Sequence, residues 1–359
     1  INILYKEGNK KMERINDSIS SKKINKIVSE IKKSEIGKDE TIIKVLLAIL
    51  AKGHILIEDK PGVGKTTMAL AFSKAMSLDY NRMQFTPDVL PTDITGFSIY
   101  NKSTGNFEYK PGVAVCNLFL ADEINRTSSK TQSALLEIME EGNITVDGKS
   151  YRLPQPYTVI ATQNPIGSIG TQMLPESQLD RFMIKLNMGY PDVKSEIKIL
   201  KSKLGDYGKG VFEVKTVVTL NELRTLQKLV ENVYINDSIF AYIAYLADAT
   251  RKHPMISLGL SPRGAISLAS MSKASALLCG RDYVIPDDVA FVFNEVAQHR
   301  IILERKASLS GLNESAVLNE ILRNVSVPAF IIYSDIFSCA AVIIRSNNYL
   351  FKIFYQGKY

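Results

Sequence analysis

The sequence predicts an α/β domain, in which helices flank a parallel sheet with hairpin insertions, followed by a smaller all-helical domain. Three observations predict this fold class. Short apolar runs alternate with segments of helical periodicity as far as residue 190. Two stretches among them alternate around turn residues, and the chain beyond residue 190 carries helical patterns with few strand signals. The 359 residues suffice for two or three domains, and a 45% hydrophobic composition is ample for buried cores.

Periodicity and start signals divide the chain into four expected segments. These are a basic N-terminal segment with an amphipathic helix (1–35), the α/β domain (36–190), a helical domain (191–305) and a C-terminal segment of uncertain structure (306–359). In the helical domain the pattern predicts helices near 193–204, 220–232, 237–251, 262–279 and 286–299. Asn236 or Asp237, Ser261 with Pro262, and Pro286 with Asp287 are typical helix starts.

A glycine-rich turn lies between an apolar run and a helical pattern. Residues 55–57 are typical of a buried strand, and residues 67–72 have apolar side chains at helical spacing. The turn between them is Asp59-Lys60-Pro61-Gly62-Val63-Gly64-Lys65-Thr66. A P-loop requires this order of strand, glycine loop, Lys-Thr and helix, because backbone N–H groups and a helix N-terminus must face phosphate together. The sequence therefore predicts a nucleoside triphosphate site.

Each part of this loop has an expected role. We expect Lys65 to reach the β- and γ-phosphates and the Thr66 hydroxyl to bind magnesium. The predicted phosphate-binding set is Pro61, Gly62, Val63, Gly64, Lys65, Thr66 and Thr67. Asp59 departs from the motif, because it occupies the position of the first glycine. From charge alone, Asp59→Gly should tighten ATP binding by about 1 kcal/mol; a large loss of binding would instead indicate a positive role for Asp59.

A second apolar strand, 117–121, ends in two acids. We expect Asp122 to bind magnesium and Glu123 to activate the attacking water. An acidic pair can also be a solvated helix start, since acids favour first turns. Its position about 55 residues after the P-loop favours the catalytic interpretation, and the glutamate indicates an ATPase.

A third strand, 157–163, places Asn164 at its carboxyl end. Ligands of parallel α/β sheets bind at that edge, so an amide there can orient water against the γ-phosphate. Taken alone, Asn164 before Pro165 is a good turn residue. Its place after the two other strands makes it a candidate sensor of the γ-phosphate.

These motifs resemble those of the MoxR family of AAA+ ATPases. The resemblance rests on residues 82–96 (RMQFTPDVLPTDITG), 121–126 (ADEINR), 161–165 (ATQNP), 174–182 (LPESQLDRF) and 259–263 (GLSPR). It covers roughly residues 36–328 and implies an AAA+ nucleotide domain with a helical lid. It further implies that Asn164 is the first sensor, Arg263 the second sensor and Arg181 an arginine finger acting on a neighbouring subunit's nucleotide.

Two of these arginines have features of their own in the sequence. Arg263 falls in the first turn of a predicted helix, where the dipole disfavours a cation, so we expect it to have a partner such as the γ-phosphate. The plainer interpretation of Arg181 is a local ion pair with Asp180 or Glu176. Arg126 belongs to the family motif, and the sequence does not assign its contact.

The resemblance also implies function and partners. MoxR-like proteins are thought to act as chaperones in maturation, or in cofactor or metal insertion, of partner protein complexes, often with a von Willebrand factor A domain protein. It implies ATP and Mg²⁺ as cofactors and a homo-oligomeric ring, expected to be a hexamer. Hairpins are indicated at 98–109 and at 143–157, the second with Asp147-Gly148 at its turn. They are surface hairpins in the plain interpretation and face the ring's pore in the resembled family.

Charge and composition limit the alternatives. The net charge of +7 comes from the two ends, since residues 1–38 carry +5, residues 329–359 carry +2 and the 290 residues between are neutral. Electrostatics therefore gives no reason to place nucleic acid on the core. The three cysteines, Cys116, Cys279 and Cys339, lack paired spacing, and no secretory pattern heads the chain, so we expect a cytoplasmic protein. Residues 329–344 are largely apolar but short for a bilayer and contain Asp335, which argues against a membrane anchor.

Two rival functions stay open at this point. One is a nucleic-acid motor or loader of the same fold, which a basic pore hairpin with several aromatic residues would support. The 143–157 hairpin has Lys149 and Arg152 against Asp147, with Tyr151 alone. The other is a nucleotide-dependent scaffold that hydrolyses poorly, which Asp59 in the P-loop would allow.

Overall fold

The computed structural model describes residues 20–60, 62–164, 174–204, 214–328, 332–333, 341–346 and 349–355. The chain divides into two compact units, which are described separately below. The first comprises Ile1–Asn232 with Leu277–Arg281, and the second comprises Val233–Ala276 with Asp282–Tyr359. The domain boundaries expected at residues 35, 190 and 305 stay predictions, because units defined by contact need not coincide with functional domains.

A parallel sheet is the centre of the first unit. In the described chain its strands are β1 (Ile55–Glu58), β2 (Tyr80–Gln84), β5 (Leu118–Asp122), β8 (Thr158–Gln163) and β9 (Ile184–Leu186). They are ordered β2-β5-β8-β1-β9, and every pairing is parallel. The predicted α/β class and all three predicted strands are confirmed. Because the strands are parallel, their carboxyl ends lie at one edge, and the P-loop follows the strand between β8 and β9.

Both faces of this sheet are buried. Leu56, Phe119 and Val159 belong to one apolar cluster together with Leu135 and Leu136 of α5. Side chains on the opposite face alternate with these along the strands and are also fully buried; they include Ile55, Ile57, Leu118, Leu120 and Ile160. Burial on both faces explains why the strands are continuous apolar runs rather than alternating ones.

Helices cover the sheet of the first unit. A helix at 20–31 buries Ile24, Ile27, Val28 and Ile31, as its periodicity predicts. The others are α2 (Asp39–Leu50), α3 (Lys65–Ala75), α4 (Pro91–Thr95), η1 (Ile124–Arg126), α5 (Ser129–Glu141), α6 (Glu176–Leu179), α7 (Val193–Leu204) and α8 (Leu220–Asn232).

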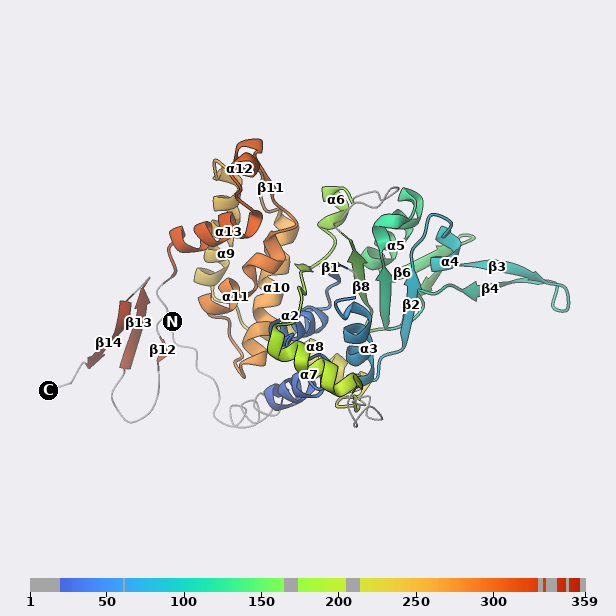
Figure 1. Ribbon diagram of the computed structural model, residues 1–359, viewed down its shortest axis with the longest axis horizontal. Helices are drawn as coiled ribbons and strands as arrows, with labels where there is room; N and C mark the ends of the chain where they lie inside the picture. Colours follow the sequence, from blue (N-terminus) through green and yellow to red (C-terminus); the bar gives the residue numbers. More distant parts are fainter. Residues whose placement is uncertain are drawn as a thin grey trace. The chain divides into compact units, whose positions relative to one another are not determined.

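The two predicted hairpins are present. β3 (Gly96–Asn101) pairs with β4 (Asn106–Pro111), and β6 (Asn143–Val146) pairs with β7 (Lys149–Arg152). The β3–β4 hairpin extends away from the sheet (Figure 1). The bases of the hairpins meet where Tyr109 stacks on Tyr151, with ring centroids 4.0 Å apart.

The second unit is mainly helical. Its helices are α9 (Asp237–Lys252), α10 (Pro262–Leu278), α11 (Pro286–Ala297), α12 (Arg305–Leu309) and α13 (Glu314–Asn324), with the short strands β10 (Ile256–Leu258) and β11 (Ile302–Leu303). The start signals hold, since the Asn236 side chain accepts from the amide of Ser238 and prolines begin α10 and α11. The β10–β11 pair and helices α12 and α13 were not predicted from the sequence.

The C-terminal segment contains strands that the sequence did not specify. β12 (Ile332–Tyr333), β13 (Ala341–Ser346) and β14 (Tyr349–Tyr355) pair in that order, antiparallel. Among the described residues, no helix combines the length and the apolar character that crossing a membrane requires.

The buried sheet predicts a contrast between two phenylalanines. Phe119 in β5 is fully buried, whereas Phe107 on the β3–β4 hairpin is 70% exposed. Phe119→Ala should lower the free energy of unfolding by about 3–5 kcal/mol. Phe107→Ala, the matched control, should change it by less than about 0.5 kcal/mol. Urea denaturation measures both, and equal losses would contradict the assigned core.

Candidate active site

The P-loop joins the carboxyl end of β1 to the N-terminus of α3. Gly62 and Gly64 have φ of 83° and 100°, a left-handed conformation that glycine adopts without a steric penalty. A Cβ on Gly64 would also lie 3.2 Å from Oε2 of Glu35. Helix α3 begins at Lys65, so loop amides and the helix N-terminus lie together, as phosphate binding requires. Val63 is buried, Thr66 is half-buried and Thr67 is exposed, whereas Pro61 lies outside the described residues.

The Lys65 side chain is held inside the loop. It is 9% exposed, and its Nζ donates to the backbone oxygen of Asp59 at 2.6 Å. Burial lowers the pKa of Lys65, and the nearby carboxylates of Asp122, Asp59 and Glu123 oppose that shift. The predicted phosphate-binding cation therefore lies within electrostatic reach of both acids at the carboxyl end of β5.

Asp122 is bound on both carboxylate oxygens by neighbouring strands. The Thr162 hydroxyl of β8 donates to Oδ1 at 2.6 Å, and Arg82 of β2 forms an ion pair with Oδ2 at 2.7 Å. The Asp122 side chain is only 14% exposed, so these donors compensate a largely desolvated charge.

Glu123 has a strained backbone and a fixed side chain. Its φ of 58° is left-handed, which costs a non-glycine residue about 1–3 kcal/mol. Its N–H donates to Oγ1 of Thr162 at 2.9 Å. Its Oε2 accepts from Nε2 of Gln84 at 2.9 Å and pairs with Nε of Arg126 at 2.7 Å. These contacts fix the direction of the Glu123 carboxylate. They also identify the contact of Arg126, which the sequence did not assign.

Asn164 lies next to these acids at the end of β8. It is 8% exposed, and its backbone oxygen accepts from Nδ2 of Asn125 at 3.2 Å. In the same region Oδ1 of Asn125 and Oε1 of Gln163 are buried without a hydrogen-bond partner among the described residues. Unsatisfied buried oxygens are uncommon, and they fit a site whose hydrogen bonds are completed by a ligand or water.

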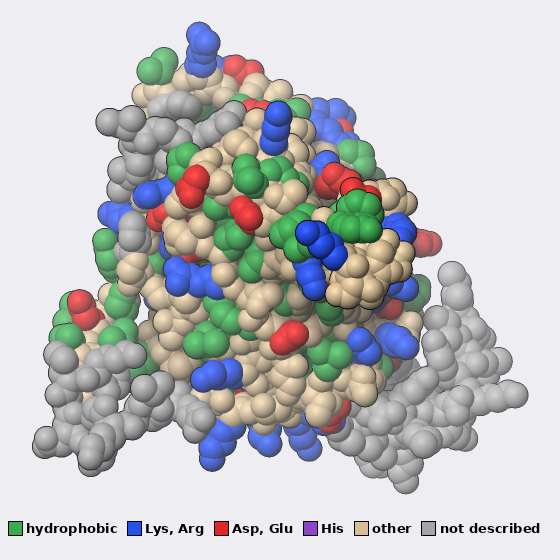
Figure 2. Space-filling view, turned by 90° about the vertical axis from the view of Figure 1, so that its right-hand side faces the viewer, with side chains coloured by type: hydrophobic (Ala, Val, Ile, Leu, Met, Phe, Trp, Pro, Cys, Tyr) green, Lys and Arg blue, Asp and Glu red, His purple; other side chains and the backbone are tan. Residues whose placement is uncertain are grey.

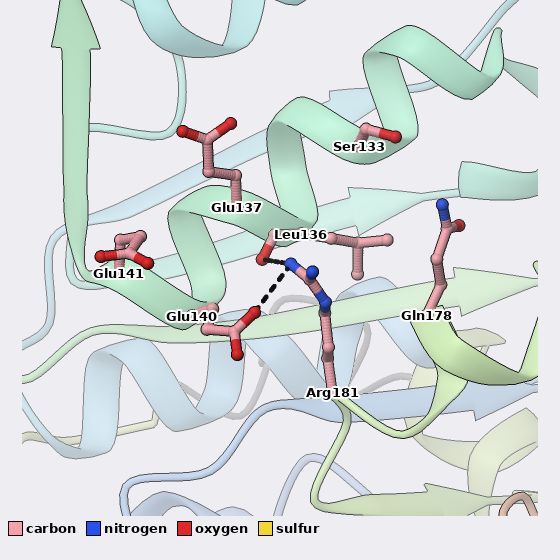
Figure 3. Close-up of a pocket in the computed structure, with 7 residues that line it drawn as sticks. All are labelled: Ser133, Leu136, Glu137, Glu140, Glu141, Gln178 and Arg181. Carbon is pink, nitrogen blue, oxygen red and sulfur yellow. Dashed lines mark hydrogen bonds and ion pairs between the residues drawn. The ribbon is translucent and has the colours of Figure 1, made fainter.

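Arg181 lies in a pocket of about 380 Å³ whose lining includes none of Lys65, Asp122, Glu123 and Asn164 (Figure 3). Its NH1 donates to the backbone oxygen of Leu136 at 2.8 Å and forms an ion pair with Oε2 of Glu140 at 3.1 Å. Glu137, Glu141 and Gln178 also line the pocket. The ion pair with Asp180 or Glu176 that the sequence suggested is wrong, because α5 supplies the partner instead.

Arg263 lies in the second unit. It is exposed in the first turn of α10, next to a cap in which Ser261 Oγ accepts from the amide of Gly264 at 3.0 Å. The structure therefore brings Lys65, Asp122, Glu123 and Asn164 together, and it does not group Arg181 with them within one chain.

Three residues of this network were missed from the sequence. Arg82, Gln84 and Thr162 contact the two acids, and each belongs to a stretch whose family resemblance was noted. The signal in the sequence that could have found them is their position near the carboxyl ends of β2 and β8. Arg82 and Gln84 point to the same side of β2 by strand alternation, and Thr162 precedes the end of β8.

The residues present fit a magnesium nucleotide. The glycine loop is open, because a Cβ at Gly62 would meet nothing within 4 Å, and a buried lysine and two acids lie next to it. Among the described residues no group of three or more His, Cys, Asp or Glu could hold a metal ion by itself. A metal held by Thr66 and Asp122 would therefore need further ligands from phosphates and water, as magnesium prefers.

Comparisons with known proteins agree with this geometry. A family described as "ATPase family associated with various cellular activities (AAA)" matches residues 54–184, and an AAA lid domain matches residues 248–321. YeaC of Bacillus subtilis is 48% identical over 305 residues, 85% of this chain and 95% of the relative. Chaperone MoxR1 of Mycobacterium tuberculosis is 36% identical over 316 residues, 85% of this chain and 82% of the relative.

A solved structure gives the same result at the level of the fold. A protein of Cytophaga hutchinsonii described as a "putative ATPase" superposes with a TM-score of 0.81 at 37% identity, covering 90% of this chain and 99% of the other. The fold and the P-loop with its two acids agree with relatives that match over most of their length. The chain therefore belongs to the MoxR family of AAA+ ATPases.

Proposed function

We propose that this chain is a magnesium-dependent ATP hydrolase that assembles into a homo-oligomeric ring and remodels partner protein complexes as a chaperone. The observation that carries the proposal is the convergence of Lys65, Asp122, Glu123 and Asn164 at one edge of the sheet. This edge combines a phosphate loop with a carboxylate whose direction is fixed by Gln84 and Arg126.

The chain's own groups have distinct tasks in hydrolysis. Lys65 would exchange its bond to the Asp59 carbonyl for one to a phosphate oxygen. Thr66 and Asp122 would hold the metal, which would neutralise phosphate charge. Gln84 and Arg126 both use Oε2 of Glu123, so we assign Oε1 to accept the proton of the attacking water. Asn164 orients that water, Arg181 supplies positive charge to a neighbouring subunit's nucleotide, and Arg263 contacts the γ-phosphate from the lid.

The surface of the β3–β4 hairpin supports a protein client. Phe97, Ile99, Tyr100 and Phe107 are 48%, 44%, 51% and 70% exposed, and Tyr100 packs edge-on against Phe107. By strand alternation Phe97 and Ile99 lie on one face of the hairpin and Tyr100 and Phe107 on the other. Exposed apolar side chains on a projecting element are typical of protein-binding surfaces. MoxR1 carries the name chaperone, and we extend that role here to maturation, or cofactor or metal insertion, with a von Willebrand factor A domain protein as partner.

The second hairpin gives little support to a nucleic-acid motor. Tyr151, the lone aromatic residue of β6 and β7, stacks on Tyr109, so one face of its ring is already covered and is not available to a base. On the face shown in Figure 2, basic side chains lie among acidic and apolar ones rather than in a continuous band. We therefore favour a protein partner.

The choice among functions can be tested by one set of rate measurements. ATP hydrolysis per chain is measured alone, with plasmid DNA, and with a von Willebrand factor A protein encoded by the same genome. We expect the protein to change the rate and DNA to leave it unchanged. Severalfold stimulation by DNA alone would favour a motor, and a background rate under all conditions would favour a scaffold.

The assigned base predicts a separation of binding from hydrolysis. Glu123→Gln should retain ATP binding while the hydrolysis rate falls about a hundredfold or more, because only water activation is lost. Lys65→Ala should instead weaken ATP binding. Glu196→Gln, an equal charge change at an exposed position of α7, should leave both unchanged. A parental hydrolysis rate in Glu123→Gln would refute the assignment of the base.

The assigned arginine finger predicts complementation between subunits. Arg181→Ala should bind ATP normally and lose about a hundredfold or more in hydrolysis, and the parental rate per chain should rise with protein concentration as rings form. Arg181→Ala and Glu123→Gln chains should partly regain activity when mixed, because some interfaces then join an intact Glu123 to a neighbour's intact Arg181. If sizing showed mixed rings and the activity did not return, the action of Arg181 on a neighbour would be excluded.

A further inference from the structure

We propose that Asp59 is a positioning residue whose carboxylate holds the segment after β9 against the phosphate loop, and that Lys38 holds the same segment through its carbonyl groups. These contacts of Asp59 and Lys38 are called the latch below. The inference goes beyond hydrolysis itself, although its effect on ATP rests on the proposed function of the loop. It assigns a positive role to the residue that replaces the first glycine of the motif.

Every polar group of Asp59 has a partner. Its Oδ2 accepts from the amide of Gly189 at 2.5 Å, across 130 positions of sequence, and its Oδ1 accepts from the amide of Lys60 at 2.7 Å. Its own N–H donates to the oxygen of Gln163 at 3.2 Å, and its carbonyl accepts from Lys65. One residue therefore joins β8, the P-loop lysine and the segment that leaves β9.

Lys38 holds the same segment through its carbonyl groups. It is 7% exposed, and its Nζ donates to the oxygens of Met188 and Gly189 at 2.6 and 2.5 Å. Gly189 thus has its N–H fixed by Asp59 and its C=O fixed by Lys38. Its φ of 62° is left-handed, which glycine adopts at little cost. Next to it, Lys60 Nζ lies 5.4 Å from the ring centroid of Tyr190.

These contacts contradict the expectation that Asp59 acts mainly by repelling phosphate. The Asp59 carboxylate accepts two backbone N–H bonds, and its charge also stabilises the protonated form of the buried Lys38. Removing the Asp59 carboxylate would leave the Gly189 amide without this acceptor. Of the two carboxylates that favour the charged form of Lys38, only that of Glu35 would then remain. A glycine at position 59 should therefore loosen the phosphate loop instead of relieving repulsion of phosphate.

The latch is tested first without nucleotide. Hydrogen exchange of the peptide containing Gly189 should be at least tenfold faster in Asp59→Gly and Asp59→Ala than in the parental chain. Lys38→Met, which removes the bonds to the oxygens of Met188 and Gly189, should also make exchange of this peptide faster. Asp79→Ala, which removes an exposed carboxylate before β2, is the control and should exchange like the parent. Parental exchange at Gly189 in Asp59→Ala and Lys38→Met would overturn the latch.

The effect on the site is tested by steady-state kinetics. Asp59→Gly should raise KM for ATP about threefold to tenfold with kcat within about twofold of the parent, because the loop is misplaced while Glu123 is untouched. A general loss of stability would instead lower apparent kcat at constant KM. Asp79→Ala, an exposed aspartate before β2, controls for the change in charge. A lower KM in Asp59→Gly would overturn the proposal.

The two proposals fail in different ways. If the parental chain did not bind ATP, the proposed function would be wrong, whereas exchange at Gly189 in nucleotide-free protein would still decide whether the latch exists. If ATP bound and was hydrolysed but exchange at Gly189 did not depend on Asp59, the latch alone would be wrong.

Discussion

The parallel pairing of β1, β5 and β8 is the constraint on which the rest of the structure depends. It buries both faces of the sheet, which fixes the strands as apolar runs, and it brings their carboxyl ends to one edge. Residues from three distant parts of the chain, Lys65, Asp122 and Asn164, meet at that edge only because the strands run the same way. The site therefore depends on the core that supports it.

Charges at this edge already have partners within the chain. Arg82 and Thr162 hold Asp122, Gln84 and Arg126 hold Glu123, and the carbonyl of Asp59 holds Lys65. Because desolvated charges are costly when unpaired, such partners stabilise the site before any ligand arrives. Binding of a magnesium nucleotide must then exchange some of these bonds for bonds to phosphate and metal. We infer that this exchange links the occupancy of the site to the position of β2 and, through Asp59, of Gly189.

Much of this arrangement could be predicted from the sequence. Hydrophobic periodicity located the strands, both hairpins and the helices near 193–299, and motif order located the P-loop and the acids. Three kinds of contact could not be predicted. The partner of Arg181 comes from α5, 41 positions away, where side-chain direction decides the contact. Arg82 and Thr162 lie in stretches that resemble the family, but the sequence pattern does not show that their side chains contact Asp122. The bond between Asp59 and Gly189 joins residues 130 positions apart, so charge alone suggested the opposite effect of Asp59.

The most direct test of the account is an experimental structure of the Glu123→Gln chain with ATP and Mg²⁺. The account predicts the phosphates against the amides of residues 62–66, with Lys65 Nζ moved from the carbonyl of Asp59 to a phosphate oxygen. It also predicts Thr66 and Asp122 at the metal and the Asp59 side chain still bonded to the amide of Gly189. A nucleotide bound elsewhere, or bound at the loop with Lys65 still on Asp59, would contradict the central claim that this edge of the sheet is the ATP site.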